Sequence, residues 1–175
     1  MKWLIVGRTG TGKDYLANRM REEGMRIVKS YATRPKRSAD EDTHIFISKD
    51  EAKAIAEAEK AAKTVIRGYE YFATKKQVMD SDAYIIDPNG VYDLVHNMPD
   101  TPFGIIYITA DEAASTRAAV ARADNTEEEE KVVSDRKEAE AMQFDAFEAR
   151  MDASLPIADN IVMVVRVTND YHTDL

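Results

Sequence analysis

Cysteine is absent from this chain of 175 residues, and histidine occurs only 3 times. Without cysteine the protein can form no disulfide, no thiolate nucleophile and no zinc site with sulfur ligands. The scattered histidines show no metal-ligand spacing. No apolar run approaches the ~20 residues that a membrane-spanning helix needs, and the apolar start at residues 3–6 is too short for a signal peptide. These absences favour a cytoplasmic protein without a membrane partner.

Basic residues are also outnumbered: 24 Lys and Arg stand against 32 Asp and Glu, a formal net charge of −8. We therefore expect no nucleic acid polymer as a partner, because proteins that bind nucleic acids attract the phosphate backbone through an excess of basic residues. An anionic small molecule would need a local basic cluster. The length and the 44% hydrophobic content are typical of one globular domain, either a monomer or a homodimer.

Short apolar segments alternate with helical ones, which predicts an α/β fold with a parallel sheet. Capping boxes starting at Ser48, Thr109 and Thr126 indicate where three helices begin. The alternation is interrupted between about residues 34 and 80, which we interpret as an inserted lobe. The expected strands are residues 3–6, 26–31, 84–86, 103–108 and 161–167, with a hairpin at 64–72; the expected helices are 13–23, 48 to about 62, a short one after Thr74, one after Thr109, and 126 to about 151.

A phosphate-binding loop is the strongest motif in the sequence. Residues 7–14 read Gly-Arg-Thr-Gly-Thr-Gly-Lys-Asp, between the first strand and the first helix. The glycines let successive N–H groups turn toward an anion, the helix adds its positive N-terminal end, and the lysine reaches the β- and γ-phosphates. ATP is the expected cofactor, and the expected cofactor-binding residues are Gly7, Arg8, Thr9, Gly10, Thr11, Gly12, Lys13 and Asp14.

Asp14 departs from the usual form of this motif, in which Ser or Thr places a hydroxyl group on Mg²⁺. A carboxylate is a good Mg²⁺ ligand, so the departure is compatible with a metal site. Asp14 could instead be a first-turn acid that complements the helix dipole. We expect a metal role for Asp14, either direct or through water.

A basic cluster follows, with five basic residues and no acid between Arg26 and Arg37. The guanidinium groups of Arg34 and Arg37 could hold a phosphate monoester through bidentate hydrogen bonds. An isolated basic run is usually a solvated loop. Beside a phosphate-binding loop, this one indicates a second anion site.

These motifs together resemble those of guanylate kinases, which are nucleoside monophosphate kinases, and the small phage and prophage members look most similar. The family's Ser-x-x-Thr-Arg-x-x-Arg element resembles residues 30–37. Its aromatic-x-Phe-(Val/Ile)-Ser, Asn-Tyr-Tyr-Gly-Ser/Thr, Asp-x-x-Gly and Asn-Asp elements resemble residues 44–48, 70–74, 87–90 and 169–170. The matches run in order across nearly the whole chain.

The resemblance implies a three-layer P-loop NTPase fold with a parallel sheet. It implies a single domain with its core at about residues 1–33 and 81–175, an inserted acceptor-binding lobe at about 34–80 and a helical lid at about 117–136. By resemblance, Lys13, Arg34, Arg37, Arg122 and Arg136 would be catalytic. Asn169 would bind ATP, Asp87 would lie near Mg²⁺ and the acceptor, and Ser30, Arg34, Arg37, His44, Tyr71, Phe72 and Thr74 would bind the acceptor.

Several positions differ from the family pattern. His44 and Phe72 stand where the family has phosphate-binding tyrosines, and a phenylalanine cannot donate a hydrogen bond. The glutamate that reads the base in the family has no counterpart within residues 63–67. Arg117, Arg122 and Arg136 resemble the family's lid arginines, although their spacing differs. Alternatively, they are exposed helix arginines that form ion pairs with the glutamates at 127–130.

The sequence thus predicts an enzyme that uses ATP and Mg²⁺ to phosphorylate a (deoxy)nucleoside monophosphate, (d)GMP first among them. A same-fold kinase acting on a non-nucleotide phosphate is one alternative, because ribose 1,5-bisphosphate phosphokinases share the Gly-Lys-Asp and Tyr-x-Thr-Arg-Pro elements. A non-catalytic guanylate kinase-like interaction module is another, although its phosphate loop would typically be degraded. A regulator that hydrolyses ATP without an acceptor is the third.

Overall fold

The computed structural model describes residues 1–36, 38–66, 68–121 and 127–170, with the side chains of 119–121, 127–130, 132 and 136 excepted. The described residues form two four-stranded sheets and the helices that pack on them. No helix in these ranges combines the length and the apolar character that crossing a bilayer requires.

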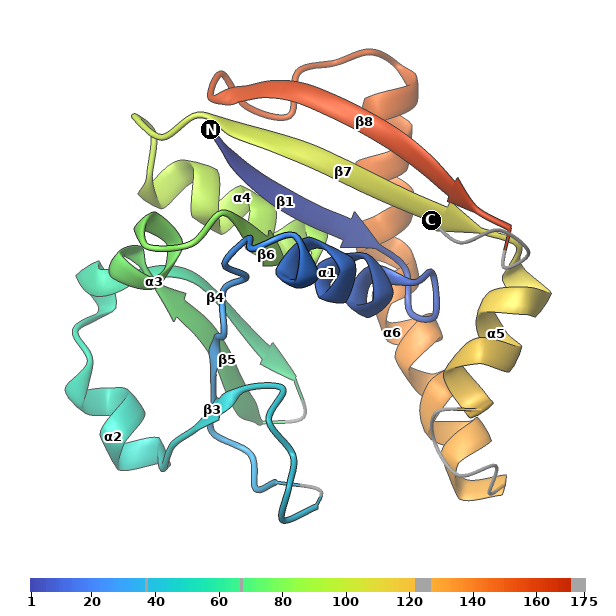
Figure 1. Cartoon of the computed structure of the whole chain (residues 1–175), viewed down its shortest axis with the longest axis horizontal. Coiled ribbons are helices and arrows are strands. Elements are labelled where there is room, and N and C mark those ends of the chain that lie inside the picture. The colour runs from blue at the N-terminus through green and yellow to red at the C-terminus, as the bar shows by residue number, and fades with distance from the viewer. Residues whose placement is uncertain (37, 67, 122–126, 171–175) are drawn as a thin grey trace.

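The first sheet is wholly parallel and holds the main core (Figure 1). Its strand order is β6 (Ala83–Ile85), β1 (Lys2–Gly7), β7 (Phe103–Ala110) and β8 (Ile161–Asn169). The central strand β1 is apolar on both faces, as expected for a parallel strand covered by helices on either side. Helix α1 (Lys13–Glu22) packs on one face, and α4 (Pro88–Asn97) and α6 (Glu127–Asp152) lie on the other.

Two clusters of buried side chains show this layering. Leu4 and Tyr107 belong to the larger cluster, together with Phe147 of α6. Ile5 and Ala17 belong to the smaller cluster under α1. Alternate residues of β1 therefore point into different halves of the core, which is the two-residue period of a strand. The predicted α/β fold with a parallel sheet is confirmed.

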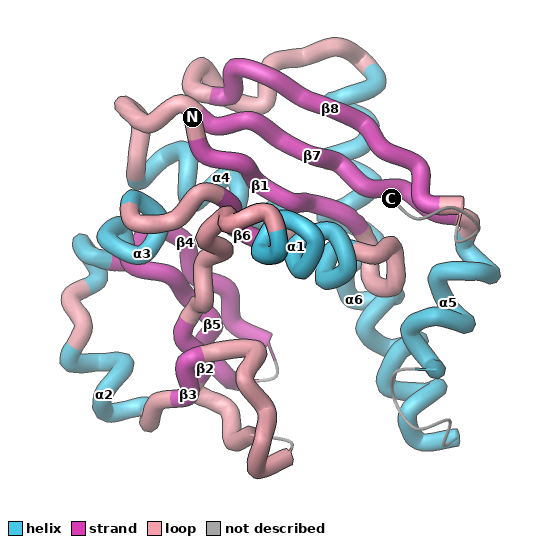
Figure 2. The backbone as a smooth tube through the Cα atoms, in the orientation of Figure 1, coloured by secondary structure: helices cyan, strands magenta, loops and turns pink. Residues whose placement is uncertain are grey.

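The second sheet lies beside the first and is formed entirely by residues 31–74 (Figure 2). Its strand order is β3 (Ile45–Phe46), β2 (Tyr31–Ala32), β5 (Tyr69–Thr74) and β4 (Lys60–Ile66). The hairpin of β4 and β5 turns at Gly68, whose φ is +77°. The short helices α2 (Lys49–Ala54) and α3 (Lys75–Met79) and a 3-10 turn (Glu57–Glu59) flank this sheet.

The strand predicted at residues 26–31 is wrong. Ile27 forms only an isolated parallel bridge with Ala83, and the N–H of Val28 donates to the carbonyl oxygen of Ala83 at 2.8 Å. The chain then leaves the first sheet, and Tyr31 pairs with Phe72 in the second. One apolar segment therefore touches two sheets in turn, which its local pattern does not reveal.

The helix predicted from residue 48 to about 62 is too long. The capping box is present, with Ser48 Oγ accepting from the N–H of Glu51 at 3.1 Å, but the helix ends at Ala54. Ile55 has extended backbone angles, and Ala61 is buried within β4. Burial in a sheet has overridden the helical preference of an alanine-rich segment.

Two other capping boxes have different outcomes. Strand β7 continues to Ala110, and the helix that follows, α5 (Glu112–Ala121), is capped by Asp111, whose Oδ1 accepts from the N–H of Ala114 at 2.9 Å. The box predicted at Thr109 is therefore wrong, because this residue lies in a strand. Thr126 lies outside the described residues. The long helix predicted after it is present as α6.

Candidate functional site

The loop between β1 and α1 has a backbone that only glycine fits at two positions. Gly10 has a φ of +86° and Gly12 a φ of +99°. A Cβ on Gly10 would lie 2.8 Å from the carbonyl carbon of Ser115 in α5, and closer still to its oxygen. A Cβ on Gly12 would lie 2.6 Å from Nδ2 of Asn169 at the end of β8. The loop is therefore tightly held between α5 and β8.

Lys13 folds back over this loop from the first turn of α1. Its Nζ donates to the carbonyl oxygens of Gly7 and Arg8 at 2.7 and 2.8 Å. Thr11 closes the loop from within, since its hydroxyl donates to the same Arg8 oxygen at 2.9 Å. A glycine-only turn, the N-terminal end of a helix and a lysine ammonium thus meet in one place, and this combination fits a phosphate group.

Asn169 is a buried contact of the loop, with 6% of its surface exposed. Its Nδ2 donates to the carbonyl oxygen of Thr11 at 3.1 Å. The end of β8 therefore supports the loop directly. The structure places this predicted cofactor-binding residue beside the other members of the predicted set.

The two predicted metal ligands lie in different settings. Asp14 is exposed in the first turn of α1. Asp87 caps α4, with Oδ1 accepting from the N–H of Gly90 at 2.7 Å and Oδ2 accepting from the hydroxyl of Thr64 at 3.3 Å. Within the described ranges no three Asp, Glu or His side chains gather around a possible ion. A magnesium ion at either carboxylate would therefore need phosphate oxygens and water as its remaining ligands, which is how Mg²⁺ is usually bound.

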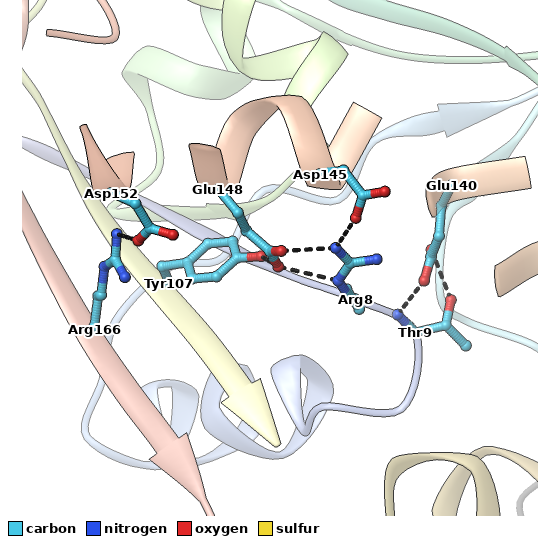
Figure 3. Close-up of polar contacts among 8 residues, drawn as sticks. All are labelled: Arg8, Thr9, Tyr107, Glu140, Asp145, Glu148, Asp152 and Arg166. Atoms are coloured by element: carbon cyan, nitrogen blue, oxygen red, sulfur yellow. Dashed lines mark hydrogen bonds and ion pairs between the residues drawn. The ribbon is translucent and has the colours of Figure 1, made fainter. Parts of the chain in front are cut away.

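The side chain of Arg8 points from the loop to helix α6 (Figure 3). Its Nε and Nη2 donate to the two carboxylate oxygens of Glu148 at 3.0 and 2.7 Å, and Nη2 also reaches Asp145 at 2.6 Å. The guanidinium lies 5.5 Å from the ring centroid of Phe144. The Tyr107 hydroxyl donates to Glu148 as well. In this structure Glu148 and Asp145 therefore occupy Nε and Nη2 of Arg8.

These contacts shift the acid–base behaviour of the cluster. Hydrogen bonding to Glu148 raises the pKa of Arg8 above its ordinary value, against the opposing effect of burial. Burial pushes the pKa of Glu148 upward, but the hydrogen bonds from Arg8 and Tyr107 outweigh it, and the net pKa is lowered. The cluster is therefore charged at neutral pH and fastens α6 to the loop.

A second carboxylate of α6 binds the next residue of the loop. Glu140 Oε1 accepts from the main-chain N–H of Thr9 at 2.6 Å, and its Oε2 accepts from the Thr9 hydroxyl at 2.9 Å (Figure 3). Sequence reasoning missed Glu140, Asp145 and Glu148. Acids on a long polar helix are a common surface pattern, and nothing local distinguishes these three.

A cleft of about 1660 Å³ opens between the loop, the end of β7 and the two helices α5 and α6. Lys137 lines it and donates from Nζ to the hydroxyls of Ser115 and Thr116 at 3.0 and 2.7 Å. Arg117 lines it too and is exposed. With Lys131, which also lines it, the cleft brings three described cations of α5 and α6 near the loop, in or beside the region where the sequence predicts a lid.

Arg34 is nine-tenths buried beneath the loop that precedes β3. Its Nη2 and Nη1 donate to the two oxygens of Glu41 at 2.6 and 2.9 Å, and its guanidinium lies 4.9 Å from the ring centroid of Phe46. Hydrogen bonding to Glu41 raises the pKa of Arg34 above its ordinary value. Its Nε is buried with no hydrogen-bond partner in the described part of the chain. Glu41 therefore occupies the two guanidinium nitrogens, Nη1 and Nη2, through which Arg34 would bind a phosphate.

Other predicted acceptor residues meet in the second sheet. His44 Nδ1 lies 3.0 Å from Ser30 Oγ, and its ring packs edge-on against Tyr71 at 5.5 Å between centroids. Phe72 points the other way and is fully buried against Tyr31, which places it in the core of this sheet. Thr74 caps α3, where its Oγ1 accepts from the N–H of Gln77 at 3.2 Å.

Three of the predicted arginines lie wholly or partly outside the described residues. Arg37 and Arg122 lie outside the described residues, and Arg136 lies in α6 with its side chain outside them. The remaining elements are arranged around the loop, with the second sheet on one side of α1 and the helices α5 and α6 on the other (Figure 1).

Comparison with known proteins identifies the fold. No protein-family model matches the sequence, and no curated protein matches it. Among solved structures, a guanylate kinase from Anaplasma phagocytophilum is similar at a TM-score of 0.58 and 16% identity, over 95% of this chain and 76% of that one. An uncharacterized protein from Eubacterium ventriosum is similar at a TM-score of 0.42 and 12% identity, over 97% of this chain and 90% of that one. The similarity to the Anaplasma phagocytophilum structure shows that the chain has a guanylate kinase-like fold, which confirms this part of the prediction.

Proposed function

We propose that the protein is an ATP-dependent nucleoside monophosphate kinase, with (d)GMP as the first candidate acceptor. The observation that carries this proposal is the loop after β1. It turns at two positions that only glycine fits, and Lys13 lies over it. This construction stands in a guanylate kinase-like fold, at the carboxyl end of a parallel strand where such folds bind ligands.

On the donor side, the main chain of residues 8–13, the Lys13 ammonium and the N-terminal end of α1 would hold the ATP phosphates. Asp14 and Asp87 are the carboxylates that would hold Mg²⁺, and bound Mg²⁺ would neutralise charge on the phosphates. Asn169 fixes the position of the loop through Thr11. These residues bind and orient, which is most of what phosphoryl transfer asks of a protein.

On the acceptor side, Ser30, His44 and Tyr71 form a group of polar side chains in contact, in and beside the second sheet. Arg34 would bind the acceptor phosphate by releasing Glu41 and donating the same two hydrogen bonds to phosphate oxygens. Two phosphate oxygens match the geometry of a guanidinium group as well as a carboxylate does. That phosphate is itself the nucleophile and needs no strong base. Movement of the second sheet and of a lid at about residues 117–136 toward the loop would exclude water from the transfer.

Thr64 bears on the choice of base, since it lies within residues 63–67, where the sequence has no counterpart of the family's base-reading glutamate. Its hydroxyl donates to Asp87, so a hydroxyl and a carboxylate face each other between the two sheets. A hydroxyl can donate or accept, whereas an ionised glutamate only accepts. A panel of acceptors must therefore decide which base the acceptor carries, and whether the acceptor is a nucleotide or a ribose bisphosphate.

The test is ADP release from ATP and Mg²⁺ with GMP, dGMP, AMP, CMP, UMP, dTMP and ribose 1,5-bisphosphate, each against a reaction without acceptor. We expect turnover with a nucleoside monophosphate and its loss in Lys13→Ala, with the circular dichroism spectrum unchanged. Lys53→Ala, which removes an exposed lysine of α2, is the matched control. Turnover with ribose 1,5-bisphosphate alone, or ADP release without any acceptor, would contradict the proposal.

A further inference from the structure

Glu140 reaches from helix α6 to the phosphate-binding loop and uses both of its carboxylate oxygens there. One oxygen accepts the main-chain N–H of Thr9 at 2.6 Å and the other accepts the Thr9 hydroxyl at 2.9 Å (Figure 3). A carboxylate resembles a phosphate in its negative charge and in its pair of acceptor oxygens. Glu140 therefore occupies, in this structure, a main-chain donor of the kind that binds phosphate in such loops.

This contact belongs to a larger attachment of α6 to the loop. Glu148, two helical turns further along, binds Arg8. Consecutive loop residues are thus held by carboxylates on one face of one helix. The Arg8 attachment leaves the loop's main chain available, whereas the Glu140 attachment occupies a main-chain N–H.

A phosphate at this loop would meet Glu140 in two ways. It would compete for the Thr9 N–H, and its negative charge would be repelled by a carboxylate within a few ångströms. The same carboxylate has other places to go, because Glu140 is only partly buried and lines the cleft. The nearby ammonium of Lys137, one turn before Glu140 on α6, also lines that cleft.

We propose that Glu140 is an internal competitor of the nucleotide. It holds the Thr9 N–H while the loop is empty, and the nucleotide phosphate displaces it and releases this part of α6 from the loop. This inference rests on the proposed function, because it takes a phosphate ligand to bind the loop. It makes Glu140 a determinant of nucleotide affinity and links loop occupancy to the helix that follows the predicted lid.

The experiment measures pyrophosphate binding by titration calorimetry in EDTA, with the full chain, so that no metal ion can bridge two anions. Glu140→Ala removes the competitor and should bind pyrophosphate about tenfold more tightly than wild type, the effect of one hydrogen bond to a charged group at a partly exposed site. Glu140→Gln keeps the shape and loses the charge, so it should tighten binding in the same direction. Glu23→Gln removes one exposed negative charge at the far end of α1 and should leave the affinity within about twofold of wild type.

The outcomes separate the two proposals. Equal or weaker binding by both Glu140 variants, with binding by wild type, would overturn the competitor and leave the phosphate site standing. Binding by none of the four proteins would overturn the proposed function and the competitor with it. If Glu140→Ala does not fold, Glu140→Gln decides alone. If pyrophosphate displaces the carboxylate, the Thr9 amide resonances of wild type and Glu140→Ala should differ in the free proteins and coincide at saturating pyrophosphate; resonances that still differ at saturation would contradict displacement.

Discussion

Replacing Gly10 with alanine tests how closely helix α5 approaches the phosphate-binding loop. An alanine at this position would have to adopt a φ of +86° and would place its Cβ 2.8 Å from the carbonyl carbon of Ser115. Ordinary carbon–carbon contacts are about 3.5–4.0 Å. The loop and α5 would therefore have to separate by about 1 Å, and no side-chain rotation can relieve the contact because the neighbour is backbone.

Gly24 is a matched control within the same chain. Its φ is +85°, almost that of Gly10, but a Cβ there would meet nothing within 4 Å. Gly24→Ala thus has the same backbone cost, about 1–2 kcal/mol for a left-handed residue, and the same effect on the unfolded chain. The difference between the two variants isolates the steric term. Overpacking typically costs about 1–3 kcal/mol, and contact with backbone places Gly10→Ala in the upper half of that range.

The measurement is urea unfolding of both variants and of wild type, followed by far-UV circular dichroism. We expect Gly10→Ala to lose about 2–3 kcal/mol more of its unfolding free energy than Gly24→Ala. Equal losses in the two variants would refute the reasoning, because they would show that α5 does not rest on the loop in solution.

Two further predictions concern charged pairs. Glu41→Gln should lower the unfolding free energy by about 2–4 kcal/mol, because it leaves the nine-tenths buried Arg34 without its carboxylate partner. Urea unfolding measures this loss, and a loss below about 0.5 kcal/mol would contradict the prediction. The pKa of Glu148 is lowered in the folded state, so its stabilising effect should be complete above the unfolded pKa of about 4.3 and disappear as the pH falls through the lower folded value. The stability difference between wild type and Glu148→Gln should therefore shrink between about pH 5 and pH 3, and a difference that does not change with pH would argue against the ion pair with Arg8.

The amino-acid sequence by itself determined the features that depend on neighbouring residues. The order of apolar strands and helices predicted the parallel sheet, and the spacing of Gly7, Gly10, Gly12 and Lys13 predicted the loop and the helix after it. Turns, caps and glycine-only backbones are local, so a short stretch of residues contains their whole cause. The resemblance to guanylate kinases, read from motifs in order, anticipated the fold.

The tertiary structure decided which distant groups meet. Thr9 and Glu140 are 131 residues apart, and Arg8 and Glu148 are 140 apart, so no local pattern could pair them. It also decided that the alanines at 61 and 62 form a strand, because burial in a sheet outweighs a small difference in helix propensity. The charges around the loop are therefore a property of the fold: packing brings α6 against β1, and only then do ordinary helix acids face a phosphate-binding turn.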